Sequence, residues 1–188
     1  MKVGILAFQG DFALHKKILK KINIETILVK NSEDLNNSDA LIIPGGESTV
    51  ISKMIILNKL ENPIKKFSLK KSIYGTCAGA ILMSSKIKDP IIKPLNIINV
   101  EVSRNSWGRQ IDSFSQSVKI SISNKRFNAN FIRAPKFKCL DNKLKILSYL
   151  DDEPILIEND KHLISSFHPE LGNDTRIHEY FLKKVVNG

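Results

Sequence analysis

Short runs of apolar residues recur along the first part of the chain. Residues 3–8, 26–29 and 40–43 are continuous apolar runs of strand length, and a fourth surrounds residues 73–75. A strand that is apolar on both faces is typical of a sheet buried on both sides. These runs therefore predict a parallel sheet covered on both faces.

Helical periodicity fills the intervals between these runs. Asp11 precedes the first such interval and is predicted to be its N-cap. The apolar positions that recur with helical spacing are Leu14, Ile18 and Ile22 in one interval and Val50, Met54 and Leu57 in another. Alternation of strands and amphipathic helices predicts the α/β class.

The middle of the chain has a different pattern. Between about residues 99 and 132, apolar and polar residues alternate, as in 100–103 and 118–122, which predicts antiparallel strands. Residues 155–157 and 163–165 predict another strand pair, and a closing helix is expected from about Asp174. No repeat or long linker divides the chain, so residues 1–188 are expected to form a single domain.

Composition narrows the class of protein. The chain has 188 residues, of which 42% are hydrophobic and 26% charged. No apolar run reaches the ~18–20 residues that cross a bilayer, and the N-terminal segment meets Asp11 too soon for a signal peptide. Cys77 and Cys139 lie far apart and lack metal-ligand spacing. We expect a cytoplasmic protein without a disulfide, a zinc site or a membrane partner.

The net charge of +10 raises the question of nucleic-acid binding. The lysines are scattered along the whole chain, and only five residues are arginine. No basic stripe interleaved with aromatic residues is present for stacking bases. We therefore expect no nucleic-acid partner, whereas an acidic protein partner stays open.

Three motifs follow predicted strands, where reactive groups collect in α/β sheets. They are PGGES at residues 44–48, GTCAG at 75–79 and SFHPE at 166–170. GTCAG is the thiol counterpart of the G-x-S-x-G nucleophile elbow. Such a turn would place Cys77 at a helix N-terminus, where the helix dipole favours a thiolate. The alternative is an inert cysteine packed in a core.

His168 favours the nucleophile interpretation. A thiol nucleophile needs a base, and the base needs a group that orients it. Glu170 is two residues beyond His168, so an extended segment would direct both side chains the same way. The remaining histidines, His15, His162 and His178, are expected at the surface or as caps, and Cys139 is expected to be inert.

Two further groups are candidates for binding. The glycines of PGGES would let backbone N–H groups approach a ligand and hold an oxyanion, although a plain turn explains them equally well. Arg104 in SRNSWGRQ and Arg133 in FIRAP could each bind a carboxylate. Solvated surface residues are the alternative for both.

Together these motifs resemble a known family. A G-x-C-x-G elbow with a distant H-P-E is the pattern of class I glutamine amidotransferases. LAFQGDF, PGGEST, GTCAGAI, VEVSRNSWGRQ, FIRAP and SFHPEL look like the glutaminase subunits of pyridoxal 5′-phosphate synthases. The resemblance implies a three-layer, flavodoxin-like α/β fold whose mostly parallel central sheet has an added antiparallel section.

The resemblance also implies residue roles. Cys77 would be the nucleophile, His168 the general base and acid, and Glu170 the group that orients His168. Backbone amides of Gly46 and Ala78 would form the oxyanion hole. The residues implied to contact glutamine are Gly46, Glu47, Ser48, Arg104, Ile132 and Arg133.

The implied reaction is hydrolysis of L-glutamine to L-glutamate through a glutamyl thioester. The ammonia would pass to a synthase subunit in a hetero-oligomer that makes pyridoxal 5′-phosphate. No cofactor is expected on this subunit: pyridoxal phosphate would be the product of the complex. The alternatives are a glutaminase that serves another synthase, a non-catalytic subunit of the same fold, and a cysteine peptidase.

Overall fold

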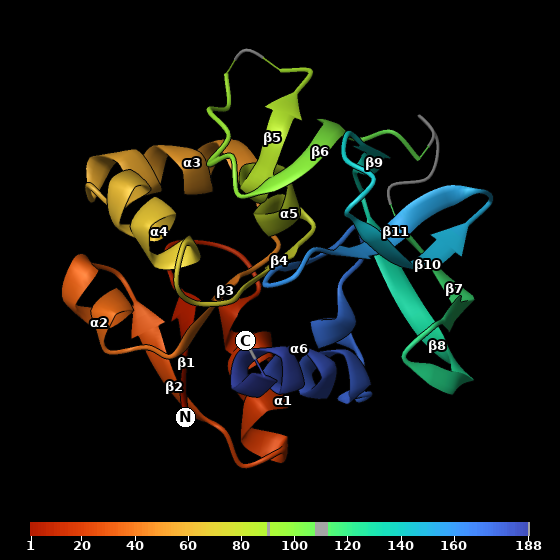
Figure 1. The fold of residues 1–188 in the computed structure, drawn as a ribbon, viewed down its shortest axis with the longest axis horizontal. Helices are drawn as coiled ribbons and strands as arrows, with labels where there is room; N and C mark the ends of the chain where they lie inside the picture. The colour runs from red at the N-terminus through yellow and green to blue at the C-terminus, as the bar shows by residue number, and fades with distance from the viewer. Residues whose placement is uncertain (90, 108–112, 188) are drawn as a thin grey trace.

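The computed structural model describes residues 1–89, 91–107 and 113–187. Seven strands form the central sheet: β1 Lys2–Leu6, β2 Glu25–Val29, β3 Ala40–Ile43, β4 Ile73–Thr76, β10 Lys145–Leu150, β11 Glu153–Glu158 and β12 Leu163–Ser165. Their order is β10-β11-β12-β4-β3-β1-β2 (Figure 1). Pairing is parallel from β2 to β12 and antiparallel from β12 to β10. The predicted α/β class and mostly parallel sheet are confirmed.

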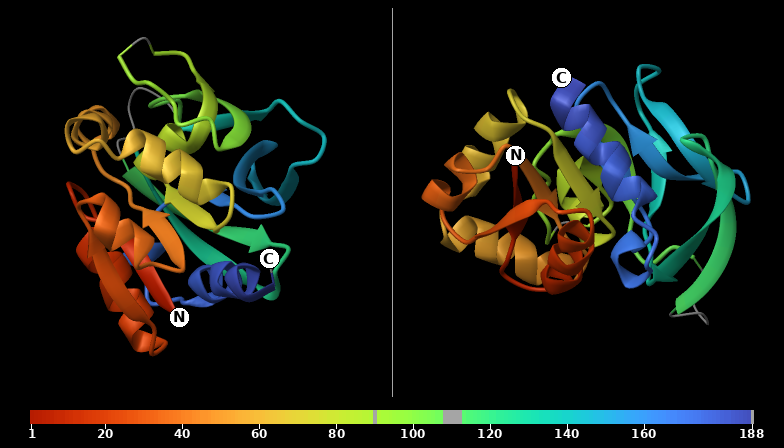
Figure 2. Two further views of the ribbon diagram at one scale, coloured as in Figure 1. Left: turned by 60° about the vertical axis from the view of Figure 1, so that its left-hand side comes forward. Right: turned by 90° about the horizontal axis from the view of Figure 1, so that it is seen from below.

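Helices cover both faces of this sheet, as the different views show (Figures 1 and 2). They are α1 Phe12–Lys21, α2 Ser32–Asn36, α3 Ser48–Leu57, α4 Glu61–Ser68, α5 Ala78–Met83 and α6 Arg176–Asn187. No helix in the described part of the chain is long and apolar enough to cross a membrane.

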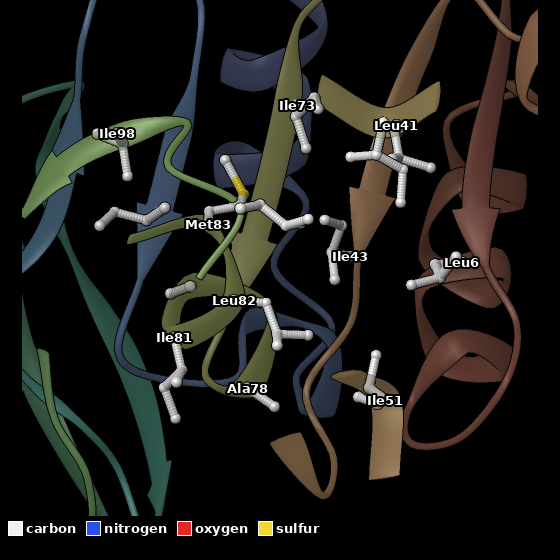
Figure 3. Close-up of a cluster of buried hydrophobic side chains, with 14 of the residues drawn as sticks. Leu6, Leu41, Ile43, Ile51, Ile73, Ala78, Ile81, Leu82, Met83 and Ile98 are labelled. Atoms are coloured by element: carbon white, nitrogen blue, oxygen red, sulfur yellow. The ribbon is translucent and has the colours of Figure 1, made fainter. Parts of the chain in front are cut away.

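Alternate residues of one strand enter different cores, which explains the continuous apolar runs. Leu41 and Ile43 of β3 join a cluster that contains residues of α2, α3, α4 and α5. Figure 3 shows both side chains with Ile51 of α3 and Leu82 of α5. Ala40 and Ile42 of the same strand join a second cluster, on the side of α1 and α6. Every residue of β3 is fully buried.

The antiparallel prediction for the middle of the chain is partly confirmed. Strands β7 Ser113–Ile120 and β8 Ser123–Ile132 form an antiparallel hairpin. Strand β6 Ile98–Ser103 pairs antiparallel with β9 Lys136–Cys139 but parallel with β5 Ser84–Ile87. The run predicted as one strand, 118–122, instead ends at Ile120, and residues 121–122 form the turn to β8. Ile122 packs against the core from this turn, so its apolar side chain extended the alternating pattern beyond the strand.

The carboxyl ends of β1, β3, β4 and β12 lie along one edge of the sheet, since these strands are parallel. The segments after them contain Asp11, the PGGES turn, Cys77 and the SFHPE turn respectively. The topology therefore brings together four loops that are distant in the sequence.

Candidate active site

Cys77 lies in a strained turn between β4 and α5. Its φ angle is +46°, in a region that residues with a side chain rarely adopt. Its backbone N–H donates to the Ser165 carbonyl at 2.8 Å, which ties the turn to β12. A Cβ atom on Gly79 would collide with the Ile43 carbonyl, so the turn needs this glycine. The predicted elbow is confirmed, and its strain favours a functional thiol over an inert core cysteine.

Glu170 contacts His168, although the backbone differs from the prediction. The expected extended segment is instead the short 3-10 helix η1, Pro169–Leu171. His168 Nδ1 lies 2.8 Å from Glu170 Oε1, and the His168 backbone N–H donates to the Asn130 carbonyl at 2.8 Å. Because a carboxylate occupies Nδ1, the other ring nitrogen is left for the thiol.

The neighbours of His168 favour its charged form. Burial of the ring opposes protonation, but hydrogen bonds with Asp11, Cys77 and Glu170 and the charge of Glu170 outweigh it and raise the pKa of His168 to about 12. Burial also raises the pKa of Glu170. The hydrogen-bond partners of His168 therefore favour an imidazolium beside the thiol.

Asp11 has a role that the sequence interpretation missed. It is the N-cap residue of α1, but its side chain makes no capping hydrogen bond. Its Oδ2 atom instead lies 3.3 Å from His168 Nδ1, because the positively charged ring attracts the carboxylate. Its position in the loop that follows β1 was the available signal, since this loop lies at the sheet edge that holds Cys77.

A cavity of about 260 Å³ opens above the thiol. The predicted site residues that line it are Gly46, Glu47, Ser48, Cys77, Arg104, Ile132, Arg133 and His168. Glu170 is buried behind His168, and Ala78 is buried at the start of α5. Residues lining the cavity that were not predicted are Gln9, Gly10, Asp11, Ile81 and Asn105.

Arg104 is held at the cavity by two carboxylates. One guanidinium nitrogen lies 3.4 Å from Glu47 Oε1, and another pairs with Asp89. Glu47 is the N-cap of α3 and accepts from the Thr49 backbone N–H at 3.3 Å. Arg133 is exposed at the rim, with φ +42°. Residues 108–110 of the predicted SRNSWGRQ motif lie outside the described residues.

The prediction for the other histidines is wrong. His15 and His178 are fully buried, and His162 is 5% exposed. Burial lowers the pKa of His162 and of His178 to about 4, and it lowers that of His15 well below its ordinary value. A neutral imidazole packs inside a protein far more readily than a charged one, which is why these rings fit the interior.

Asp11, His168 and Glu170 also have the composition of a metal site. One ligand atom from each lies within 4.8 Å of the others. However, His168 Nδ1 and Glu170 Oε1 already share a proton at 2.8 Å, and a cation would have to displace it.

The mostly parallel sheet and the thiol at the carboxyl end of β4 define the class of the protein: its fold is that of the class I glutamine amidotransferases. A crystal structure described as a glutamine amidotransferase superposes with a TM-score of 0.93 and 41% sequence identity, covering 98% of each chain. The chain belongs to the SNO glutamine amidotransferase family, whose model matches residues 5–187.

Curated relatives make the likeness more specific. The chain is 41% identical to a protein of Thermosipho africanus named pyridoxal 5′-phosphate synthase subunit PdxT, over 98% of this chain and 99% of that protein. It is 42% identical to the protein of the same name in Fervidobacterium nodosum, over 98% of this chain and 97% of that one.

Proposed function

We propose that the chain hydrolyses L-glutamine to L-glutamate and ammonia as the glutaminase subunit of a pyridoxal 5′-phosphate synthase. The observation that carries this proposal is the strained turn of Cys77 beside His168, whose Nδ1 bonds to Glu170. The names of the two PdxT relatives support the choice of synthase. Such a site requires no cofactor of its own.

Cys77 is the nucleophile of the first step. The thiolate attacks the side-chain amide carbon of glutamine, and the tetrahedral oxyanion accepts hydrogen bonds from backbone N–H groups of Gly46 and Ala78. Ala78 begins α5, and the first N–H groups of a helix have no partner within it. A well-placed donor of this kind contributes ~3 kcal/mol to transition-state stability.

His168 transfers the protons. As an imidazolium it protonates the departing ammonia, which leaves a γ-glutamyl thioester on Cys77. The neutral ring then takes a proton from water, which attacks the thioester and releases glutamate. Glu170 keeps the ring oriented and stabilises its charged form through the 2.8 Å contact with Nδ1.

The cavity walls suit an amino-acid substrate. Arg104 and Arg133 supply positive groups for the α-carboxylate, and Glu47 supplies a negative one for the ammonium. Backbone groups of Gly46, Ser48 and Ile132 complete the contacts to glutamine. Because Glu47 and Asp89 hold Arg104 in place, little side-chain entropy is lost when the substrate binds.

The partner is the synthase subunit, which receives the ammonia directly in a hetero-oligomer. We further propose that residues 1–188 work as one domain, since loops between Gln9 and His168 line a single cavity. A cytoplasmic location is proposed as well. It is supported by the two free thiols, Cys77 and Cys139.

The test is glutamine hydrolysis by the chain assembled with a pyridoxal 5′-phosphate synthase subunit. C77A should lower glutamate release by about 10⁴-fold or more, because no other group replaces the nucleophile. The matched control C139A should keep activity within about twofold. Ammonium salts should restore pyridoxal phosphate formation to the C77A complex.

Two results would contradict the proposal. Ammonia release by the C77A complex would show that the thiol is not the nucleophile. A wild-type complex that binds the synthase yet releases no glutamate would favour the non-catalytic alternative.

A further inference from the structure

Two buried histidines form a polar chain behind the triad. His15 on α1 and His178 on α6 are fully buried. His178 Nε2 lies 3.0 Å from His15 Nδ1, and His15 Nε2 lies 3.2 Å from Thr76 Oγ1. The same His15 nitrogen lies 3.5 Å from Glu170 Oε2. The chain of polar groups therefore runs from α6 through α1 to the triad carboxylate.

The second oxygen of Glu170 needs a partner. Oε1 contacts His168, whereas Oε2 has no hydrogen bond among the residues that the structure describes. A buried carboxylate oxygen without a nearby donor is destabilising. The titratable groups that face Glu170 are Asp11 before α1, His15 on α1, Tyr74 on β4 and His168. Among these, His15 directs a nitrogen at Oε2.

The hydrogen-bond partners indicate which nitrogens carry the protons. Both rings are neutral at neutral pH, because burial lowers the pKa of each, so each has one N–H. His178 Nδ1 has no partner in the described part of the chain. A buried lone pair without a partner is tolerated better than a buried N–H without one, which assigns the His178 proton to Nε2. His178 then donates to His15 Nδ1, and the proton of His15 lies on Nε2.

We propose that His15 is a positioning residue of the triad. This rests on the proposed glutaminase function. The His15 Nε2–H hydrogen-bonds to Thr76 Oγ1 at 3.2 Å and has Glu170 Oε2 beside it at 3.5 Å. Its positive end stabilises the carboxylate and fixes the orientation in which Glu170 holds His168. At 3.5 Å the contact with Glu170 is too long for a strong hydrogen bond, so the N–H acts mainly through the electrostatic attraction between its dipole and the carboxylate. His178 sets the tautomer of His15.

Thr76 extends the same network to the substrate side. Its hydroxyl oxygen, in contact with His15, accepts from the Gly45 backbone N–H at 2.9 Å. Gly45 packs directly on His168, since a Cβ atom there would collide with the ring. His15 is thereby linked to His168 from two directions, through Glu170 and through the PGGES turn.

The first experiment compares H15L with H15Q in the assembled complex. H15L should lower kcat for glutamine hydrolysis about 10- to 100-fold with KM unchanged within about twofold, because Glu170 loses its oriented donor. It should also move the acid limb of kcat/KM to higher pH, since the carboxylate takes up a proton more readily. H15Q can place an amide N–H near the position of Nε2 and should keep kcat within about fivefold of wild type.

The matched control is H162L. His162 is also buried and accepts from the Ile73 backbone N–H at 3.2 Å, and it lies at the opposite end of β12 from His168. H162L should lower the unfolding midpoint and leave the pH profile unchanged. Suppose that the wild-type complex is active and that H15L keeps both the wild-type kcat and the unchanged pH profile expected of H162L. The inference about His15 is then wrong, while the glutaminase function stands. If the wild-type complex hydrolyses no glutamine, and the C77A complex behaves in the same way, the glutaminase function itself is overturned.

A second readout does not depend on activity. Nitrogen-15 spectra of the wild-type chain should show His15 and His178 both neutral and both protonated at Nε2. A proton on His15 Nδ1 would overturn the assignment. These spectra decide the question if H15L does not fold.

Discussion

The two ends of β12 carry histidines of opposite character. His162 precedes the strand and His168 follows it, and both are buried. The pKa of His162 is lowered to about 4, whereas that of His168 is raised to about 12. Burial disfavours the charged ring at both ends, so the difference comes from the partners.

Those partners follow from the direction of the strands. At the amino end of β12, His162 accepts from the Ile73 backbone N–H, which suits a neutral ring. At the carboxyl end, Glu170 and Asp11 contact His168 Nδ1 at 2.8 and 3.3 Å, which suits a charged ring. Identical side chains at opposite edges of one sheet thus become a structural acceptor and a proton-transfer group.

Removing the charge of Glu170, the carboxylate closer to His168, should have the largest effect on the contrast between His168 and His162. E170Q keeps the shape of the side chain but removes the charge that stabilises the imidazolium and sets its tautomer. We expect kcat for glutamine hydrolysis to fall about 10³- to 10⁴-fold. The unfolding midpoint should change by only a few degrees, because replacing one buried charge also removes its desolvation cost. An E170Q complex that keeps a tenth of wild-type kcat would show that proton transfer by His168 does not depend on the charge of Glu170.

Removing the second carboxylate should have a smaller effect. Asp11 is farther from the ring and its side chain is 32% exposed, so D11N should lower kcat about 3- to 10-fold. Because the hydrogen bond that Asp11 accepts from His168 raises the pKa of His168, its loss should move the alkaline limb of the pH–rate profile to lower pH. E25Q, the same change of charge at a surface ion pair with Lys2, is the control. Identical alkaline limbs in D11N and wild type would remove Asp11 from the mechanism.

The amino end of β12 should affect stability and not catalysis. Unfolded His162 binds a proton below about pH 6.5, whereas the folded residue does so only below about 4. The unfolded state binds more protons in this window, so stability is lost as the pH falls through it. His162 should account for about 2 kcal/mol of that loss between pH 7 and pH 5.

Urea unfolding of the wild type and H162L at pH 7, 6 and 5 checks this value. H162L should be less stable than the wild type at pH 7, and the gap should narrow by about 2 kcal/mol at pH 5. Parallel pH dependences would mean that His162 titrates normally in the folded protein.

The periodicity of the chain was sufficient to predict most of the parallel core. The apolar runs at 3–8, 26–29, 40–43 and 73–75 correspond to β1, β2, β3 and β4, because burial on both faces leaves an unbroken signal. The middle was harder to predict. Strand β6 pairs parallel with β5 and antiparallel with β9. An alternating pattern predicts a strand but does not specify which strands it pairs with.

The motifs at strand ends also predicted the thiol, the imidazole and their carboxylate, since each occurs in a distinctive local sequence. The positions of His15 and His178 were misjudged, and the contact of Asp11 with His168 was missed, for a common reason. Each lies in or beside a helix where local spacing is typical of a surface or capping residue, yet each is paired with a residue far along the chain.

The sequence by itself determined the parallel strands β1 to β4, the elbow at Cys77 and the family, because these depend on neighbours in the chain. Only the tertiary structure decided which histidine is charged. That outcome depends on carboxylates that parallel strands bring to one edge of the sheet, and on the dry interior that leaves the other three histidines neutral.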